Sequence, residues 1–308
     1  MGGGSPGRPR SPGRLLPVPP DTYLKDIVAA HRSRAAADTR VIDDLVARAR
    51  TAPAPRPFAE RLGVAVGGTL AVIAEVKRRS PSRGVLDGDL DPARAAADYA
   101  AGGAACLSVL TDGPHFGGSP ADLRAARAAC PLPVLRKDFT VCAADVCDAR
   151  IMGADAVLLI VAALSDAELA EFLALAAQVS LAAVVEVHDE LELERALDAG
   201  AAIVGVNQRD LATFSVDRDR AVAMAGAIPD DVVAVAESGI RGPDDAERLA
   251  AAGYQAVLVG ESLVTAGDRT TAVSGLVGKA VGPRRAGGSP GATPCDRPAA
   301  DGAPGTGF

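Results

Sequence analysis

The amino-acid sequence predicts an α/β fold: a (β/α)8 TIM barrel with an N-terminal helical extension and disordered Gly/Pro-rich tails. Short apolar runs rich in β-branched residues occur eight times, and Ala-rich segments with helical spacing separate them. Strands that alternate with helices form a parallel sheet, and eight such units close into a barrel. Several helical segments end in glycine just before the next strand, as left-handed helix caps do. A doubly wound open sheet is the alternative, disfavoured because no G-x-G-x-x-G motif follows the first strand.

The chain begins with a segment, residues 1–20, dominated by glycine, proline and arginine, and this composition predicts a disordered tail. Across residues 22–50, apolar side chains recur at helical intervals until prolines within 53–57 interrupt the pattern. We therefore expect N-terminal helices before the first strand. The barrel and these helices should form one domain over residues 21–280, followed by a second disordered tail at 281–308.

The predicted strands follow in regular order at residues 71–76, 106–110, 133–136, 156–161, 183–187, 203–206, 232–236 and 256–259. The predicted helices between them lie at residues 92–101, 121–129, 143–152, 166–178, 190–199, 217–225 and 243–252. Alanine, valine and leucine dominate both sets, and small aliphatic side chains suit helices that lie closely over a parallel sheet.

Length and charge limit the class of function. A chain of 308 residues that is 48% hydrophobic is long enough for one large domain with a sizeable core. The net charge of −7 argues against a general nucleic-acid binder, although a few cations can still converge on an anion in one cleft. No apolar run approaches the length of a membrane span, and the N-terminus lacks the hydrophobic region of a signal peptide. We therefore expect a cytoplasmic protein without a membrane partner.

The cysteines give no sign of a metal or redox centre. Cys106, Cys130, Cys142, Cys147 and Cys295 form no C-x-x-C pair and no cluster with histidine. We interpret them as free thiols. Nothing in the sequence is typical of a metal cage, a flavin-binding motif or a Schiff-base cofactor site, so we expect neither a metal nor a cofactor.

Charged side chains gather at the predicted strand ends, where the chemistry of this fold takes place. Glu75, Lys137, Glu186 and Glu237 end odd-numbered strands, and alternate strands share a layer of the barrel interior. We therefore expect these four side chains around one pocket. Side chains alternate along a strand, so Lys77 points the same way as Glu75 and lies just above it. One member alone could be a structural ion pair, but the set predicts an acid–base site for an anionic substrate.

Two glycine-containing turns follow strands 7 and 8, and each leads into the start of a helix. Backbone N–H groups at helix N-termini bind phosphate, and these two loops are its usual place in the fold. The alternative is that the glycines only shape tight turns. The candidate residues are Ser238, Gly239, Gly260 and Glu261. Separately, strand 6 presents Asn207, with Arg209 just beyond it. We therefore expect a phosphorylated small molecule as the substrate.

Four further residues lie in loops near these strand ends. Ser80 belongs to a polar turn after strand 1 that supplies hydroxyl groups, and Phe116 is placed to cover an apolar part of the substrate. His115 should be exposed, and His188 should either lie behind the site or cap the next helix. We expect neither histidine to be catalytic.

At these residues the sequence resembles the indole-3-glycerol phosphate synthases, the ring-closing enzymes of tryptophan biosynthesis. The resemblance covers roughly residues 23–278 and rests on motifs at seven of the eight strand ends. These motifs are IAEVKRRSPSRG (73–84), LSVLTD with FGGS (107–119), PVLRKDF (133–139), VEVH (185–188), GVNQRDL (205–211), AESGI (236–240) and VLVGESL (257–263). An N-terminal helix that helps to cover the substrate is also a feature of that family.

The resemblance implies that 1-(2-carboxyphenylamino)-1-deoxyribulose 5-phosphate closes to indole-3-glycerol phosphate with loss of CO2 and water. It implies that Lys137 is the general acid, and neighbouring cations are expected to lower the pKa of this desolvated lysine. Lys77 would contact the substrate carboxylate and assist dehydration, and Glu186 would be the general base. The remaining matches are Glu75, Asn207 and Glu237, which hold lysines and hydroxyls; Arg209 and Ser80, near the substrate; and Ser238, Gly239, Gly260 and Glu261, at the phosphate.

The sequence departs from the family pattern at Gln208 and at Ala144-Asp145, which leaves substrate affinity open but not the reaction class. The first alternative function is a phosphoribosylanthranilate or related Amadori-type isomerase, disfavoured because strand 1 ends in Glu-x-Lys. The second is a non-catalytic barrel, which should have lost one of Lys77, Lys137 or Glu186. We expect a monomer that associates at most weakly with other tryptophan-pathway enzymes.

Overall fold

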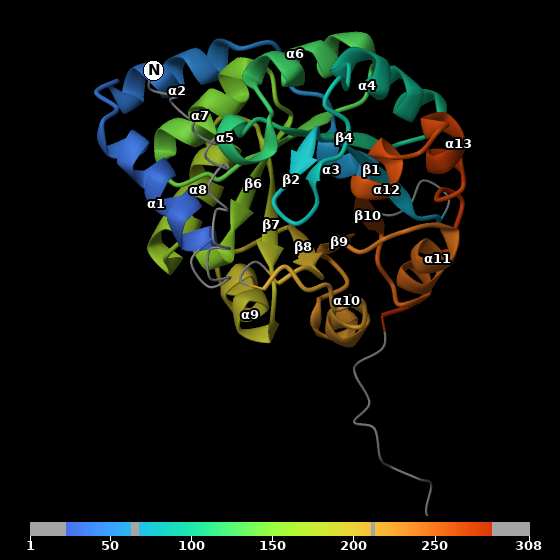
Figure 1. The fold of residues 1–308 in the computed structure, drawn as a ribbon. Helices are drawn as coiled ribbons and strands as arrows, with labels where there is room; N and C mark the ends of the chain where they lie inside the picture. Colours follow the sequence, from blue (N-terminus) through green and yellow to red (C-terminus); the bar gives the residue numbers. More distant parts are fainter. Residues whose placement is uncertain (1–22, 63–67, 211–212, 285–308) are drawn as a thin grey trace, which may run out of the picture.

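The computed structural model describes residues 23–62, 68–210 and 213–284, and its centre is a closed barrel of eight parallel strands (Figure 1). The first strand pairs with both the second and the last barrel strand, which closes the sheet. The barrel strands are β1 (Ala71–Val76), β4 (Cys106–Leu110), β5 (Val134–Lys137), β6 (Ala156–Ile160), β7 (Ala182–Val187), β8 (Ile203–Asn207), β9 (Val233–Glu237) and β10 (Ala256–Val259). The predicted fold is confirmed, and each strand begins and ends within one residue of its prediction.

Helices surround the barrel and cover the outer face of the sheet (Figure 1). The predicted helix at 217–225 is shorter, because the carboxylate of Asp217 accepts a hydrogen bond from the backbone N–H of Asp219 and holds this segment in a turn. The periodicity did not indicate the last helix. The helices of the outer ring are α4 (Pro92–Ala101), α6 (Pro120–Ala129), α7 (Ala143–Met152), α8 (Asp166–Gln178), α9 (Glu190–Asp198), α10 (Arg220–Met224), α11 (Pro243–Ala251) and α13 (Arg269–Ser274).

The strands divide the apolar core into an outer and an inner part. Val72 and Ala74 of β1 belong to the cluster between the sheet and the helices, whereas Ile73 belongs to the cluster inside the barrel. The short helix α3 (Phe58–Leu62) contributes its two large apolar side chains to the inner cluster. Because side chains alternate along a strand, the same face that buries Ile73 carries Glu75 at the C-terminal end of the barrel.

The N-terminal extension contains two helices before α3, rather than one continuous helical stretch. They are α1 (Tyr23–Ala36) and α2 (Ile42–Thr51). Between them, the carboxylate of Asp38 accepts hydrogen bonds from the backbone N–H and the guanidinium of Arg40. Such local side-chain contacts compete with helical hydrogen bonds. α1 lies across the C-terminal end of the barrel, because Ile27 joins the inner cluster and also lines the cavity at that end.

The loops at this end carry three short elements. The polar turn predicted after strand 1 is an antiparallel hairpin of β2 (Arg79–Ser80) and β3 (Gly84–Val85). Gly84 has a φ of +72°, which glycine adopts without strain. The loop after β4 contains α5 (Gly113–Phe116), and α12 (Glu261–Val264) follows β10 directly. α12 is the short extra helix that the phosphate prediction required.

Several predictions concern residues at the margins of the structure. The predicted tail at 1–20 and the part of the second tail from 285 onward lie outside the described residues. The chain remains packed on the barrel as far as Arg284, whose guanidinium donates hydrogen bonds to several backbone carbonyls, including that of Val232.

The described cysteines are free thiols, and Cys295 lies outside the described residues. Within the described ranges, no helix has both the length and the apolar character needed to cross a membrane.

Candidate active site

A cavity of about 450 Å3 lies at the C-terminal ends of the barrel strands. Its wall includes every residue that the sequence singled out as a site residue. From the strand ends come Glu75, Lys77, Lys137, Glu186, Asn207 and Glu237, and from the loops come Ser80, Phe116, Arg209, Ser238, Gly239, Gly260 and Glu261. The predicted convergence of the odd-numbered strands on one pocket is therefore confirmed as geometry.

The centre of the cavity is a lysine held between two carboxylates. The ammonium of Lys137 donates to Glu186 at 2.5 Å and to Glu237 at 2.8 Å. These residues end β5, β7 and β9, and both carboxylates are almost fully buried. The amide of Asn207, at the end of β8, donates to the other oxygen of Glu186 at 3.1 Å. The cluster can therefore hold a proton donor and a proton acceptor next to each other, shielded from water.

The charges around Lys137 raise its pKa. Burial disfavours the ammonium form, but the carboxylates of Glu186, Glu237 and Glu75 favour it more strongly, so the pKa lies above that of an ordinary lysine. The expected lowering by neighbouring cations is wrong. The nearest charged groups are carboxylates, and the other lysine of the site, Lys77, is paired with Glu75.

The two carboxylates beside Lys137 differ in pKa. Burial opposes ionisation of Glu186, but the charges of Lys137 and His188 and a hydrogen bond from Asn207 lower its pKa. Burial raises the pKa of Glu237 to about 7, and the charge of Glu186 adds to this effect. When two carboxylates share one site, each disfavours ionisation of the other, and one of the two pKa values rises. Glu186 is therefore the charged member of the pair and Glu237 the member that takes up a proton near neutral pH.

Space for Glu237 comes from a glycine on the neighbouring strand. A Cβ atom at Gly205, in the middle of β8, would lie 2.2 Å from Oε1 of Glu237. That oxygen is buried and has no hydrogen-bond partner among the described residues. An unpaired carboxylate oxygen in a buried position favours the protonated form. Gly205 thus leaves room for the carboxyl group of Glu237 in the buried position that raises its pKa.

A second lysine–carboxylate pair lies at the end of β1. Lys77 donates to Glu75 at 2.5 Å, and the hydroxyl of Ser108 lies 3.4 Å from the other oxygen of Glu75. Gly260, at the end of β10, packs directly against this pair: an added Cβ would lie 2.5 Å from Oε1 of Glu75 and 3.1 Å from Nζ of Lys77. The predicted pairing of Glu75 with Lys77 is confirmed.

Turns after β9 and β10 form one end of the cavity. Ser238 and Gly239 have φ angles of +64° and +75°, so the chain turns sharply directly after Glu237. Gly260 precedes α12, whose first backbone N–H groups have no partner within the helix. Arg83, on the hairpin after β1, pairs with Glu261 at 2.9 Å and also lines this end. Nothing in the sequence pattern singled out Arg83, because it lies in an irregular turn.

The other half of the cavity is apolar and lies under α1. Phe116 of α5 and Phe139 after β5 have ring centroids 6.3 Å apart. Leu158 and Ile160 of β6 complete the wall from below, while the helix covers it with Tyr23, Leu24 and Ile27. Apart from Phe116, the sequence pattern indicated none of these as site residues, since apolar side chains on a strand or helix look the same whether they face a core or a ligand.

His115 and His188, which the sequence analysis expected not to be catalytic, both contact carboxylates. His188 lies 3.5 Å from Glu186 and hydrogen-bonds Glu192 through its ring and its backbone N–H. It therefore lies behind the site, and the helix α9 is capped by the next residue, Asp189, whose carboxylate accepts the backbone N–H of Glu192. His115, expected to be exposed, is half-buried against Asp112, which accepts its backbone N–H at 2.7 Å.

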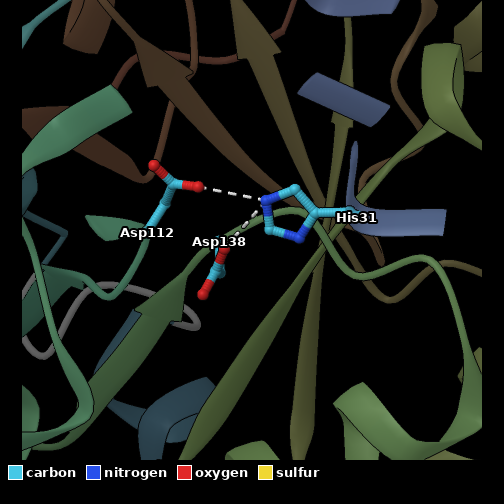
Figure 2. Close-up of side chains that lie close together, drawn as sticks. All are labelled: His31, Asp112 and Asp138. Carbon is cyan, nitrogen blue, oxygen red and sulfur yellow. Dashed lines mark hydrogen bonds and ion pairs between the residues drawn. The ribbon is translucent and has the colours of Figure 1, made fainter. Parts of the chain in front are cut away.

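One cluster among the described residues has the spacing and donor types of a metal site: His31, Asp112 and Asp138 (Figure 2). Its oxygen atoms are already engaged. Asp138 accepts hydrogen bonds from the hydroxyl of Thr111 and the guanidinium of Arg136, and Asp112 accepts from His31. A guanidinium directly on a carboxylate competes with a cation for the same oxygen atoms. The donor set therefore fits a hydrogen-bonded ion cluster better than a metal centre.

Comparison with known proteins gives a consistent result. The family model for indole-3-glycerol phosphate synthase matches residues 24–276. Indole-3-glycerol phosphate synthase 2 from Streptomyces coelicolor is 53% identical over 230 residues, which cover 75% of this chain and 88% of the relative. The enzyme of the same name from Mycobacteroides abscessus is 47% identical over 256 residues, or 83% and 94% of the two chains. A solved structure of thiamine phosphate pyrophosphorylase from Pyrococcus furiosus shares the fold, with a TM-score of 0.51 and 15% identity over 67% of this chain and 93% of that one.

Proposed function

The chain belongs to the indole-3-glycerol phosphate synthase family, and we propose that Lys137 and Glu186 are the general acid and base of its reaction. Enzymes of this family are carboxy-lyases of tryptophan biosynthesis. They convert 1-(2-carboxyphenylamino)-1-deoxyribulose 5-phosphate into indole-3-glycerol phosphate, CO2 and water. The substrate carries an aromatic acid at one end and a phosphate at the other. The cavity likewise has an apolar end and an end formed by the turns after β9 and β10, which can bind a phosphate.

The two ends of the cavity orient the substrate. The turns at Ser238-Gly239 and Gly260-Glu261 receive the phosphate through backbone N–H groups, with Arg209 nearby. The aromatic ring packs against the wall formed by Phe116 and its neighbours, and its carboxylate meets Lys77. This pose places the ribulose carbons beside the Lys137 cluster. Holding both ends of a flexible substrate accelerates ring closure, because it brings the reacting carbons into contact.

Ring closure requires a proton on the ketone oxygen as the aromatic carbon attacks. Lys137 supplies it, because its raised pKa keeps it protonated at neutral pH. A strongly held proton is a poor acid, and the protonation of Glu237 relieves this by removing one of the charges that stabilise the ammonium. Glu237 and Glu75 thus set the acidity of the lysine, and Asn207 keeps Glu186 oriented.

The ring-closed intermediate then loses CO2 from the carbon that bore the carboxylate, which restores part of the aromatic system. The remaining hydroxyl leaves as water after it accepts a proton from Lys77, while Glu186 removes a proton from the ring-closed intermediate. Glu186 suits the base, since its lowered pKa keeps it ionised. The overall balance is one substrate to one indole product, one CO2 and one water.

The observation that carries the assignment is the position of Lys137 within hydrogen-bonding distance of both Glu186 and Glu237 in one cavity. In the test, purified protein is mixed with the anthranilate-derived ribulose phosphate, and indole fluorescence is followed. We expect Lys137→Ala to lower kcat by at least about 10³-fold, in the range of a lost general acid. Its circular dichroism and thermal unfolding should show an intact barrel, and Lys25→Ala, exposed on α1, is the matched control.

The same experiment separates the alternatives. An Amadori-type isomerase would act on phosphoribosylanthranilate and give no indole, and a non-catalytic barrel would act on neither compound. A silent wild-type protein would therefore contradict the assignment, and so would a Lys137→Ala variant with full activity.

We propose further that the protein works as a cytoplasmic monomer which associates at most weakly with other tryptophan-pathway enzymes. The described cysteines are free thiols, which suits a reducing compartment. The exposed large apolar residues of the described surface, Val41, Ile42, Val85 and Leu191, form no extended patch of the kind that marks a stable interface. Light scattering across a dilution series tests this: a dimer that persists at nanomolar concentration would contradict it.

A further inference from the structure

His31 is a buried histidine near the middle of α1, and it faces two carboxylates from different barrel loops (Figure 2). Its Nε2 lies 3.1 Å from Asp112, which follows β4, and 3.9 Å from Asp138, which follows β5. The imidazole itself does not line the cavity. It therefore connects the helix above the barrel with two loops at the strand ends.

The surroundings of both carboxylates are well defined. Asp112 also accepts hydrogen bonds from the backbone and the ring of His115, and Asp138 from Arg136 and Thr111. Each aspartate is thus fixed from the barrel side and presents one oxygen toward the helix. Burial opposes ionisation of Asp112, but the contacts with His31 and His115 lower its pKa, so it remains charged.

The helix that His31 fixes forms one wall of the cavity. Ile27 lies four residues before His31, on the same helical face, and Tyr23 lies one turn further toward the N-terminus. Tyr23 and Ile27, together with Leu24, line the apolar half of the cavity. Arg32 attaches the same helix to the barrel from a more exposed position: its guanidinium donates to both carboxylate oxygens of Glu168 and to the backbone carbonyl of Ala163. The contact at His31 is the buried polar attachment of α1 to the loops after β4 and β5.

The loops on the other side of this contact also belong to the cavity. Asp112 caps the N-terminus of α5, and the last residue of that helix is Phe116. Asp138 directly follows Lys137, and the next residue, Phe139, packs its ring 5.3 Å from the imidazole of His31. One imidazole thus contacts three of the segments that form the apolar half of the site: α1, the loop after β4 and the loop after β5.

We propose that His31 is a positioning residue: it fastens α1 to the loops after β4 and β5 and so shapes the apolar half of the site for the aromatic end of the substrate. The inference rests on the proposed function. It assigns His31 no contact with the substrate and no proton transfer, so its removal should weaken binding of the aromatic end more than it slows the chemistry.

The first experiment compares KM and kcat. His31→Ala is expected to raise KM for the anthranilate-derived ribulose phosphate roughly tenfold, because a buried hydrogen bond to a charged group is lost, while kcat changes by less than about threefold. His31→Lys supplies a side-chain N–H donor to the aspartates and should return KM to within about threefold of wild type. His31→Leu removes the donor but fills most of the space, and it replaces the alanine variant if that variant does not fold. Lys25→Ala, exposed on the same helix, is the control and should behave as wild type.

The second experiment uses two fragments of the substrate and needs no turnover. Anthranilate probes the apolar half of the cavity and inorganic phosphate probes the turns after β9 and β10. Calorimetry should show weaker anthranilate binding to His31→Ala and unchanged phosphate binding. Equal weakening of both fragments would mean that the variant loosens the whole barrel, and the proposal would be wrong.

Two other outcomes would overturn the proposal. An active wild type with the same KM as His31→Ala would show that α1 needs no such contact, whereas an inactive wild type would contradict the proposed function instead. A rise in melting temperature with Zn2+ or Mn2+ that is lost in both His31→Ala and His31→Lys would identify the cluster as a metal site. Rescue by lysine, which does not replace histidine as a metal ligand, supports the hydrogen-bonded cluster.

Discussion

The two halves of the cavity are built in different ways. The polar half consists of side chains at the ends of barrel strands, so the sheet hydrogen bonds that define the fold also set their positions. The apolar half depends on α1, which belongs to no β/α unit and is attached through side-chain contacts such as that of His31 with Asp112. If the proposed function is right, the comparison teaches that chemistry and substrate fit have separate structural origins. Changes in the polar half should affect kcat, and changes in the apolar half should affect KM.

In the polar half, substitution of a glycine should disturb the geometry of the charged side chains most directly. Gly260→Ala places a methyl group against Glu75 and Lys77, so the pair must move. We expect kcat/KM to fall by about 10²-fold, as small displacements of reacting groups do. Steady-state kinetics on Gly260→Ala and on the control Gly267→Ala, which meets no atom within 4 Å, measures this. If both variants retain wild-type activity, the pair does not require the observed geometry.

The proton balance of the polar half gives a prediction on pH. The pKa of Glu237 is raised above its value in the unfolded chain, so between pH 4.5 and about 7 the folded state binds more protons than the unfolded state. Stability contributed by this group is therefore full at low pH and is lost as pH rises through about 7.

Replacement of Glu237 by glutamine removes this dependence. Relative to wild type, the free energy of unfolding of Glu237→Gln should increase between pH 5 and pH 8 by on the order of 1–3 kcal/mol. Urea unfolding at a series of pH values measures the difference, with Glu247→Gln on the surface of α11 as the control. A constant difference across this range would show that Glu237 ionises normally.

Substitutions in the apolar half should have a smaller effect, and they should change KM instead of kcat. Phe116→Ala removes a ring from the wall that we propose receives the aromatic end of the substrate, and we expect KM to rise roughly tenfold with kcat nearly unchanged. Leu191→Ala, whose side chain is exposed on α9, is the matched control. If Phe116→Ala lowers kcat instead, the separation between the two halves is not as proposed.

The sequence predicted the polar half well because a parallel barrel leaves little freedom at its strand ends. Once the strand containing Glu186 is placed, alternation and layering determine which side chains meet it. The sign of the pKa shift of Lys137 could not be found in this way. It depends on whether carboxylates or cations are nearest, a difference of a few ångströms that spacing along the chain does not show.

The contacts that attach α1 to the barrel also could not be predicted from the sequence pattern. His31 and Asp112 are separated by 81 positions in the chain, and no periodicity relates a helix outside the barrel to the loop it contacts. The same holds for the hairpin after β1, where Arg83 reaches Glu261 across the cavity. Contacts of this kind depend on the assembled tertiary structure, and of these four residues only Glu261 was a site candidate in the sequence.

Gly205 and Glu237 constrain how this enzyme can evolve. A glycine in the middle of a strand weakens it, and most single substitutions at position 205 would be expected to favour strand formation. They would also collide with the carboxylate of Glu237. A larger residue at 205 becomes accessible only after position 237 has been shortened, and on the proposed mechanism that change would remove the carboxyl group that tunes Lys137. The order of these two substitutions is thus set by a single missing side chain.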